Sequence, residues 1–572
     1  MNAGRQPGGL LRSWFVALLL FFSLWTFAVA QSIYSMLVAN PNFLEVRLSG
    51  NSQLLGIVAV FNLLPPLLLS LAWLLARQLG EQLGRGFLGI VAAGLLLLLF
   101  WQAQNLYLGE WWHSLSRSYL FWLLPAGLLG LALARSPKGA RAFALVAAPL
   151  MLLLPVVFLA RTWSIHQESA RQSGQNLQQA LSRAASLERP AVFFLIFDEL
   201  SLPVLFDTRG GIDAAAFPRF AELARHSYWF RQATANADFT NNSLPTMLTG
   251  NFPRRAGLTQ QALPENIFAL LEPHYELFLY ETWSKFCLPQ RYHCLRDSDR
   301  LEAGHAALFL DVFYLFAARA VPRGARLPLP DVRKNWGFFF HPRLIIDLAL
   351  RRYERFLEAL SALDPSSGVF VFFHNSLPHS PYWVKPDGKV VEEESAAFDP
   401  AQRGDAAQVD AVFARYSDQV AFVDSQLGRF LDLLKQRNLF DASLLIVTSD
   451  HGVSYDPRAP GRDLVVEDGL ALNAEQLLRV PLLIKRPHQK EGLVSDREVQ
   501  LIDIMPTVAD VVGLEVPWAQ EGRSVFSPSA PLRNRVAYDR SGHRYEFPGD
   551  PRQGWRVLTP DPRRPERAEQ PR

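Results

Sequence analysis

The sequence contains only two cysteines in 572 residues, Cys287 and Cys294. A structural zinc site needs about four ligands, so two thiols with the neighbouring His293 do not indicate one. In an oxidising compartment, two cysteines this close in the chain are typical of a local disulfide. We therefore predict a disulfide between Cys287 and Cys294, and a location outside the cytoplasm for this part of the chain.

The sequence also lacks a strong charge of either sign. It holds 57 Lys and Arg against 54 Asp and Glu, which gives a net charge of +3. The basic residues are scattered along the chain rather than gathered in one stripe with aromatic residues between them, as nucleic-acid-binding proteins show. Nucleic acid is therefore not an expected partner. No internal repeat or long low-complexity run is evident.

Long apolar runs are nearly confined to the first 161 residues, where charged residues are scarce. A membrane-spanning helix needs roughly 20 mainly apolar residues. Five segments approach this length: 13–31, 53–76, 86–103, 119–134 and 143–161. The long uncharged stretches disfavour the alternative, that these runs are buried helices of a soluble protein. We therefore predict an α-helical membrane domain of about five spans.

The charges between these spans predict the orientation of the chain, because Lys and Arg are retained on the cytoplasmic side. The basic residues cluster before the first span and in alternate loops: Arg5, Arg12, Arg77, Arg85, Arg135, Lys138 and Arg141. The other loops hold only Arg47 and Arg117. This pattern places the N-terminus inside and everything after the fifth span outside. The segment 28–30, Ala-Val-Ala, is also typical of a signal-peptidase site, so cleavage of the first span stays an alternative.

The rest of the chain mixes charged, aromatic and apolar residues, as globular domains do. We predict a transmembrane domain over 1–162, a polar linker or stalk over 163–190 and a globular domain over 191–530. A C-terminal extension follows over 531–572. Its last residues, from Pro560, are dominated by Pro, Arg and Glu, which is typical of a disordered tail.

Within the globular domain, short apolar runs are typical of buried parallel strands. They lie at 191–197, 369–373, 444–448 and 480–484. Apolar residues recur at helical spacing between them, most clearly over 411–436. The pattern predicts an α/β sandwich with a largely parallel central sheet. Ligands of such sheets gather beyond the carboxyl ends of the strands, so the chemistry is expected just after these runs.

Carboxylate and imidazole side chains lie at three of these strand ends. The first run ends in Asp198 and Glu199, and the run 444–448 is followed by Ser449, Asp450 and His451. The run 369–373 ends in His374, with His379 five residues later. Such side chains can converge on one divalent cation, and this mixture of oxygen and nitrogen donors suits zinc or manganese rather than calcium or magnesium. Asp198, Asp450 and His451 are the main predicted ligands.

These motifs resemble those of the alkaline phosphatase/sulfatase superfamily. The stretch 444–452, Leu-Leu-Ile-Val-Thr-Ser-Asp-His-Gly, is similar to the metal-binding strand end of sulfatases, phosphoethanolamine transferases and lipoteichoic acid synthases. Val-Pro-Leu-Leu-Ile-Lys at 480–485 and Asp-Ile-Met-Pro-Thr at 503–507 follow in the order of that superfamily. Leu-Pro-His-Ser-Pro at 377–381 resembles its substrate-side histidine segment. The resemblance runs from about 191 to 525 and implies an alkaline-phosphatase-like fold.

The resemblance also implies a nucleophile. In the segment 240–253, the tail Leu-Thr-Gly-Asn-Phe-Pro is similar to that of the sulfatase nucleophile helix, which places Thr240 where sulfatases carry their modified cysteine. The sulfatase signature Cys-x-Pro-x-Arg is absent, and the segment instead resembles transferases that use threonine. Thr240 is therefore the predicted nucleophile, with an N-cap role as the alternative. His379 and His374 are predicted to bind the substrate or protonate the leaving group. Glu199 is a further predicted metal ligand, although it departs from the paired aspartates of sulfatases.

The layout of a membrane anchor with an external domain is similar to that of phosphoethanolamine and phosphoglycerol transferases, whose donors are phospholipids of the same bilayer. The resemblance implies transfer of a phospho-group from a phospholipid to an envelope glycan or lipid through a phospho-threonine intermediate. The enzyme would lie in the inner (plasma) membrane with its catalytic domain periplasmic or extracellular. One alternative is a hydrolase of sulfate or phosphate esters. Another is an inactive partner of an envelope-assembly complex, against which the intact Thr240, Asp450 and His451 argue. The oligomeric state is not indicated.

Overall fold

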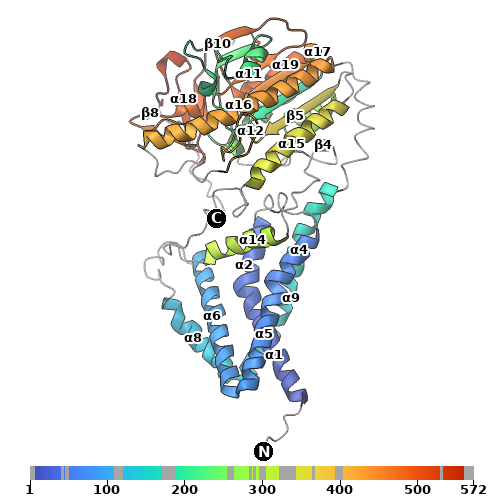
Figure 1. The fold of residues 1–572 in the computed structure, drawn as a ribbon, viewed down its shortest axis with the longest axis vertical. Coiled ribbons are helices and arrows are strands. Elements are labelled where there is room, and N and C mark those ends of the chain that lie inside the picture. Colours follow the sequence, from blue (N-terminus) through green and yellow to red (C-terminus); the bar gives the residue numbers. More distant parts are fainter. Residues whose placement is uncertain are drawn as a thin grey trace, which may run out of the picture. The chain divides into compact units, whose positions relative to one another are not determined.

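The computed structural model divides the chain into two compact units (Figure 1). The membrane unit comprises residues 1–171 and 298–345, and the globular unit comprises 172–297 and 346–572. The structure describes the following residues: 7–39, 44, 51–107, 120–170, 189–253, 263–281, 286–287, 291–294, 305–320, 343–363, 368–392, 404–527 and 532–558. The return of 298–345 to the membrane unit was not indicated by the sequence patterns.

The described part of the membrane unit is helical, as expected from its apolar runs. Among the described residues, four helices are long and apolar enough to cross a membrane: Leu11–Val38, Asn51–Leu79, Glu81–Gln102 and Pro137–Trp163. The fifth expected span corresponds to the 16-residue helix α8 (Leu120–Arg135). The elements are α1 (Pro7–Trp25), α2 (Gln31–Ala39), α4 (Asn51–Val58), α5 (Leu64–Leu79), α6 (Glu81–Tyr107), α8, α9 (Pro137–Ala170) and α14 (His305–Ala320).

Two π-helical turns, Thr26–Ala30 and Ala59–Leu63, join α1 to α2 and α4 to α5. They face each other, because the indole N–H of Trp25 donates to the Phe61 carbonyl at 2.7 Å and the Thr26 hydroxyl donates to the Asn62 amide oxygen at 2.8 Å. Hydrogen bonds of this kind hold helices together within a membrane, because the hydrophobic effect does not drive helices together in lipid. The first two spans are therefore fixed to each other at mid-length.

The globular unit is built on an eight-stranded sheet with the order β10-β2-β9-β6-β1-β5-β3-β4. All of its pairings are parallel except those of β9, which runs antiparallel to β2 and β6. The strands are β1 (Val192–Phe197), β2 (Tyr228–Thr234), β3 (Glu276–Tyr280), β4 (His293–Cys294), β5 (Val369–Asn375), β6 (Leu444–Ser449), β9 (Leu482–Lys485) and β10 (Leu493–Gln500). The expected α/β domain with a mostly parallel central sheet is confirmed, whereas the reversal of β9 could not be read from its apolar composition.

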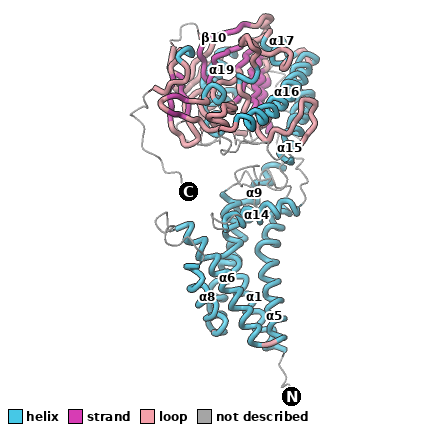
Figure 2. The backbone as a smooth tube through the Cα atoms, turned by 60° about the vertical axis from the view of Figure 1, so that its left-hand side comes forward, coloured by secondary structure: helices cyan, strands magenta, loops and turns pink. Residues whose placement is uncertain are grey.

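Helices cover both faces of this sheet, and Figure 2 shows them around the central strands. Phe193, Leu195 and Phe197 of β1 pack in one core, whereas Val192 and Phe194 pack in the other, because successive side chains of a strand point to opposite faces. The first core is closed by α11 (Pro218–Ala224), α15 (Arg343–Ala362) and α16 (Ala406–Gln436), and the second by α12 (Thr240–Thr249), α13 (Ile267–Leu271) and α19 (Ile504–Val512). This double burial explains the unbroken apolar runs of the sequence.

The region after the sheet also packs on the globular unit. It forms a hairpin of β11 (Arg535–Tyr538) and β12 (Arg544–Phe547). The side-chain amide of Asn236 donates a hydrogen bond to the Val536 carbonyl at 2.8 Å, and this contact connects the hairpin to the end of β2. The remaining short elements are α17 (Leu439–Ala442), β7 (Val466–Glu467), β8 (Leu470–Ala471) and α18 (Ala474–Leu477). The predicted Cys287–Cys294 disulfide is formed, with the two Cα atoms 5.8 Å apart.

Candidate active site

The register of three neighbouring strands assembles the site. Phe197, the last residue of β1, pairs with Asn375 of β5 and with Ser449 of β6. Asp198 and Asp450 each follow directly, so their side chains leave the sheet at the same level. His374 is the penultimate residue of β5. The parallel sheet thus brings together residues up to 252 positions apart, Asp198 and Asp450.

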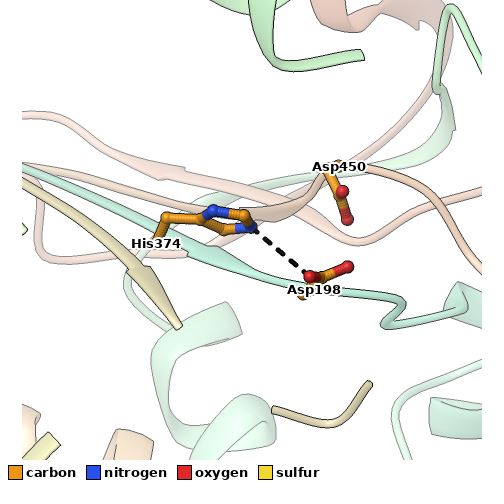
Figure 3. A group of neighbouring side chains, drawn as sticks. All are labelled: Asp198, His374 and Asp450. Carbon is orange, nitrogen blue, oxygen red and sulfur yellow. Dashed lines mark ion pairs between the residues drawn. The ribbon is translucent and has the colours of Figure 1, made fainter. Parts of the chain in front are cut away.

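Asp198, His374 and Asp450 form a compact buried group (Figure 3). Each offers a ligand atom within 4.8 Å of those of the other two. Nε2 of His374 lies 4.0 Å from Oδ2 of Asp198. All three side chains are at least 98% buried. This arrangement can hold one metal ion.

The electrostatics of this group fit a cation. Burial raises the pKa of Asp198 well above its ordinary value, and the nearby carboxylates of Asp450 and Glu199 raise it further. Among the described residues, Oδ1 of Asp198 and Oδ2 of Asp450 have no hydrogen-bond partner. Buried carboxylates without partners are costly unless they are neutralised or bind metal. Burial also lowers the pKa of His374 to about 4, which leaves the imidazole neutral and able to ligate.

The turn after β6 is fixed by backbone contacts. Oδ1 of Asp450 accepts hydrogen bonds from the backbone N–H of His451 at 2.8 Å and of Glu199 at 3.2 Å. Gly452 passes so close to α18 that an added Cβ would lie 2.1 Å from the carbonyl oxygen of Gln476. Only glycine fits there. In the Asp-His-Gly sequence, two candidate site residues are thus followed by a position that only glycine can occupy.

Thr240 is the first residue of α12 and is 94% buried. Its Oγ1 lies 3.3 Å from Nε2 of His451. Nδ1 of His451 lies 2.8 Å from the Gly452 carbonyl oxygen, which can only accept, so this nitrogen carries the proton and Nε2 presents its lone pair. The Thr240 side chain does not cap its own helix, because the residue lies inside the helix and Phe239 holds the cap position. Thr240 therefore lies beside the candidate metal group, through its contact with His451.

The Glu199 side chain contacts two basic residues. It forms an ion pair with Arg462, and Oε1 lies 3.8 Å from Nε2 of His379. Burial raises its pKa, but Arg462 and His379 more than offset that, so the pKa of Glu199 is held below its ordinary value. Its backbone is in the left-handed region, with φ of 64°, which is unusual for a residue other than glycine. The hydroxyl of Tyr416 donates to the Glu199 carbonyl at 2.8 Å and supports this conformation.

His379 lies beside this pair. Burial lowers its pKa to about 4, and Nδ1 lies 2.6 Å from the Ser380 carbonyl oxygen. As with His451, Nδ1 carries the proton and Nε2 is directed at the site. Arg462 keeps 21% of its side chain exposed and stays charged, because Glu199 counters the effect of burial on its pKa. A cation at the mouth of such a site suits an anionic ester.

The structure therefore brings together all seven residues singled out from the sequence: Asp198, Glu199, Thr240, His374, His379, Asp450 and His451. The structure groups these residues into a metal side and a substrate side differently from the sequence interpretation. His374, expected on the substrate side, lies with the two aspartates, whereas Glu199, expected as a ligand, pairs with Arg462. Arg462 was missed, because it lies in a loop after β6 with no strand or motif signal of its own.

Residues 190–514 match the model of a protein family described as Sulfatase. Curated proteins match shorter stretches. A steryl-sulfatase of Mus musculus is 34% identical over 141 residues, which cover 23% of this chain and 22% of that protein. A lipoteichoic acid synthase of Staphylococcus saprophyticus is 28% identical over 173 residues, which cover 30% of this chain and 25% of that protein. The matched segments thus span about a quarter of the length of these relatives.

Solved structures match over a longer range at lower identity. A phosphonate monoester hydrolase from Silicibacter pomeroyi is 19% identical, with a TM-score of 0.42. The match covers 61% of this chain and 79% of that one.

Proposed function

Because the chain belongs to the sulfatase family, we propose that it is a membrane-anchored, metal-dependent enzyme that transfers a phospholipid-derived phospho-group to an envelope glycan or lipid. One observation carries the proposal: a threonine hydroxyl, rather than a cysteine, lies 3.3 Å from His451 at the buried metal group. A hydroxyl in this position can form and release a phosphoester.

Asp198, His374 and Asp450 would hold the metal, with Nε2 of His451 as a further ligand. Oδ2 of Asp450 lies 3.5 Å from this nitrogen, so one ion can contact both. Zinc or manganese suits the mixed oxygen and nitrogen donors. When bound, the ion lowers the pKa of the Thr240 hydroxyl and neutralises charge on the ester.

The protein side chains account for the rest of the first step. Oγ1 of Thr240 forms a bond to phosphorus as the bond from phosphorus to the departing oxygen breaks, and the proton lost by the Thr240 hydroxyl is balanced by the proton gained by the released alcohol. The product of this step is a phospho-threonine. The guanidinium of Arg462 binds non-bridging oxygens of the ester, and Glu199 holds that guanidinium in place. In the second step an acceptor hydroxyl attacks the phospho-threonine and restores Thr240.

The membrane unit supports transfer over free hydrolysis. The protein is membrane-anchored by four long apolar helices, so a phospholipid donor in the same bilayer is at high local concentration. The loop charges support a location of the globular unit outside the cytoplasm, where envelope glycans and lipids are assembled.

A second candidate function is hydrolysis of sulfate or phosphate esters. It is favoured by the segment that matches a steryl-sulfatase. The same site would serve it, with water in place of the acceptor alcohol in the second step.

Product analysis separates the two functions. Purified full-length protein in vesicles of phosphatidylethanolamine and phosphatidylglycerol, each labelled in the headgroup, should release diacylglycerol and transfer the label to an added envelope extract. Free labelled headgroup phosphate with no labelled acceptor would support hydrolysis instead. Cleavage of an aryl sulfate without any diacylglycerol would overturn the transferase proposal.

A further inference from the structure

The helix α14 lies between two segments of the globular unit in sequence but belongs to the membrane unit. The chain passes β4, which ends at Cys294, forms α14 over His305–Ala320, and re-enters the globular unit from Ile346 within α15. Within the membrane unit, α14 packs against α2, α4 and α6. It runs crosswise to the long helices at the end of the bundle where α2 ends and α4 begins (Figure 1).

One face of α14 is part of the core of the helical bundle. Leu308, Val312 and Phe316, spaced four residues apart, are buried in the same cluster as the spans. The ring of Phe309 contacts that of Phe61 edge-on, with centroids 6.1 Å apart. It also fills the space beside Gly56, where an added Cβ would lie 2.8 Å from the Phe309 ring. α14 is therefore seated closely on the spans.

The opposite face is also apolar. Ala306, Leu310 and Phe313 recur at helical spacing and are exposed, with Leu310 at 50% and Phe313 at 56%. Asp311 interrupts the apolar sequence of α14 but is itself buried, so the exposed face at these three positions is apolar, and such a face is usually covered by protein or lipid. With 16 residues it is about 24 Å long, less than the roughly 30 Å hydrocarbon core, so it is too short to cross a membrane.

The depth of α14 indicates what covers this second face. Gly56, which Phe309 contacts, lies in the membrane-crossing helix Asn51–Leu79, and the adjacent Leu55 is 49% exposed on that helix. An exposed apolar side chain on a membrane-crossing helix suits lipid, and the contact between Phe309 and Gly56 puts α14 at this level of the span. Aromatic side chains are enriched at this boundary between headgroups and acyl chains.

We propose that Ala306, Leu310 and Phe313 form a membrane-interface surface that binds the lipid leaflet, so that α14 attaches the middle of the globular unit's chain to the membrane. The globular unit is then tethered by α14 as well as by the end of α9. The inference holds for a transferase and a hydrolase alike.

Spin labels on the full-length protein in phosphatidylethanolamine and phosphatidylglycerol vesicles test this directly. Both native cysteines are in the disulfide, so an introduced cysteine is the reactive thiol. Labels at Leu310→Cys and Phe313→Cys should collide more often with oxygen than with a water-soluble nickel complex. Ile90→Cys, 76% exposed on α6, is the lipid control, and Lys389→Cys, 79% exposed on the globular unit, is the water control.

Two results would overturn the proposal. Preferential collision with nickel would show that the face meets water, and protection from both reagents would show that the globular unit or another protein covers it. A lipid-soluble diazirine reagent applied to the unsubstituted protein gives an independent reading, because it should modify the peptide that contains residues 306–313.

Discussion

The hydroxyl oxygen of Thr240 lies 3.3 Å from Nε2 of His451, although 211 residues separate them in the sequence. Thr240 is placed by the start of α12, and His451 by the end of β6. Because different elements position the proposed nucleophile and the proposed ligands, substitutions can remove one without dismantling the other.

The first prediction concerns the nucleophile. Thr240→Ala should lower turnover by roughly 10³-fold or more, because no other group stands where the covalent intermediate forms. Metal content and thermal unfolding should change little. Thr240→Ser keeps the oxygen and should retain partial activity. Thr249→Ala is the matched control, since its hydroxyl donates to the Pro245 carbonyl on the same helix and lies outside the metal group. Near-normal turnover of Thr240→Ala with metal bound would contradict the mechanism.

The second prediction concerns His374. If it is a ligand, His374→Ala should weaken metal affinity by at least about 100-fold, since even groups that only orient a ligand contribute 10- to 100-fold. His379→Ala is the control, because that side chain faces Glu199 and should leave affinity nearly unchanged. Two measurements report the metal affinity of each variant. They are the metal content after dialysis and the rise in unfolding temperature on adding zinc or manganese. Equal metal binding by His374→Ala and the unsubstituted protein would remove His374 from the ligand set.

The third prediction concerns orientation. An alkaline phosphatase reporter fused after Trp163 should be active, because this point lies beyond the last span, whereas a fusion near Arg141 should be inactive. The basis is the excess of Lys and Arg in the loops assigned to the cytoplasm. The reverse pattern of reporter activity would place the globular unit in the cytoplasm.

The fourth prediction concerns Glu498 on β10, which is 95% buried. Burial raises its pKa to about 7, with partial relief from Arg533. The folded state therefore binds a proton that the unfolded state has lost between about pH 4.5 and 7, so stability falls as pH rises through this window. Glu498→Gln should remove that loss and be more stable than the unsubstituted protein at pH 8, by up to about 3 kcal/mol, with little gain at pH 4.5.

Thermal unfolding of the full-length protein at the two pH values measures this effect. Glu491→Gln, at an exposed position near the start of the same strand, is the control and should show no such difference. A stability gain of Glu498→Gln that is equal at both pH values would show that proton linkage is not its cause.

Much of the site could be predicted because its residues follow buried strands. The unbroken apolar runs before Asp198 and Asp450 identify strands with both faces covered, and parallel strands place their carboxyl ends together. Proximity of the two aspartates follows from topology alone. Topology does not predict which of His374 and Glu199 lies with the two aspartates. That depends on the direction in which each side chain leaves its strand end and on the left-handed backbone of Glu199.

Other features had no local signal. Arg462 reaches the site from an irregular loop, so only the folded chain brings it to Glu199. The apolar sequence of α14 is equally compatible with a core helix of the globular unit, and its place in the membrane unit depends on tertiary contacts such as Phe309 with Phe61. The antiparallel direction of β9 is likewise set by how the chain returns to the sheet.

The most direct test of the central claim is mass spectrometry of the purified full-length protein after brief incubation with membrane phospholipids and metal. The account predicts that the peptide containing Thr240 gains the mass of a phospholipid headgroup phosphate. It also predicts that the adduct disappears when an acceptor is added, and that Thr240→Ala never shows it. Release of diacylglycerol at a normal rate with Thr240 unmodified at every time point would contradict the account.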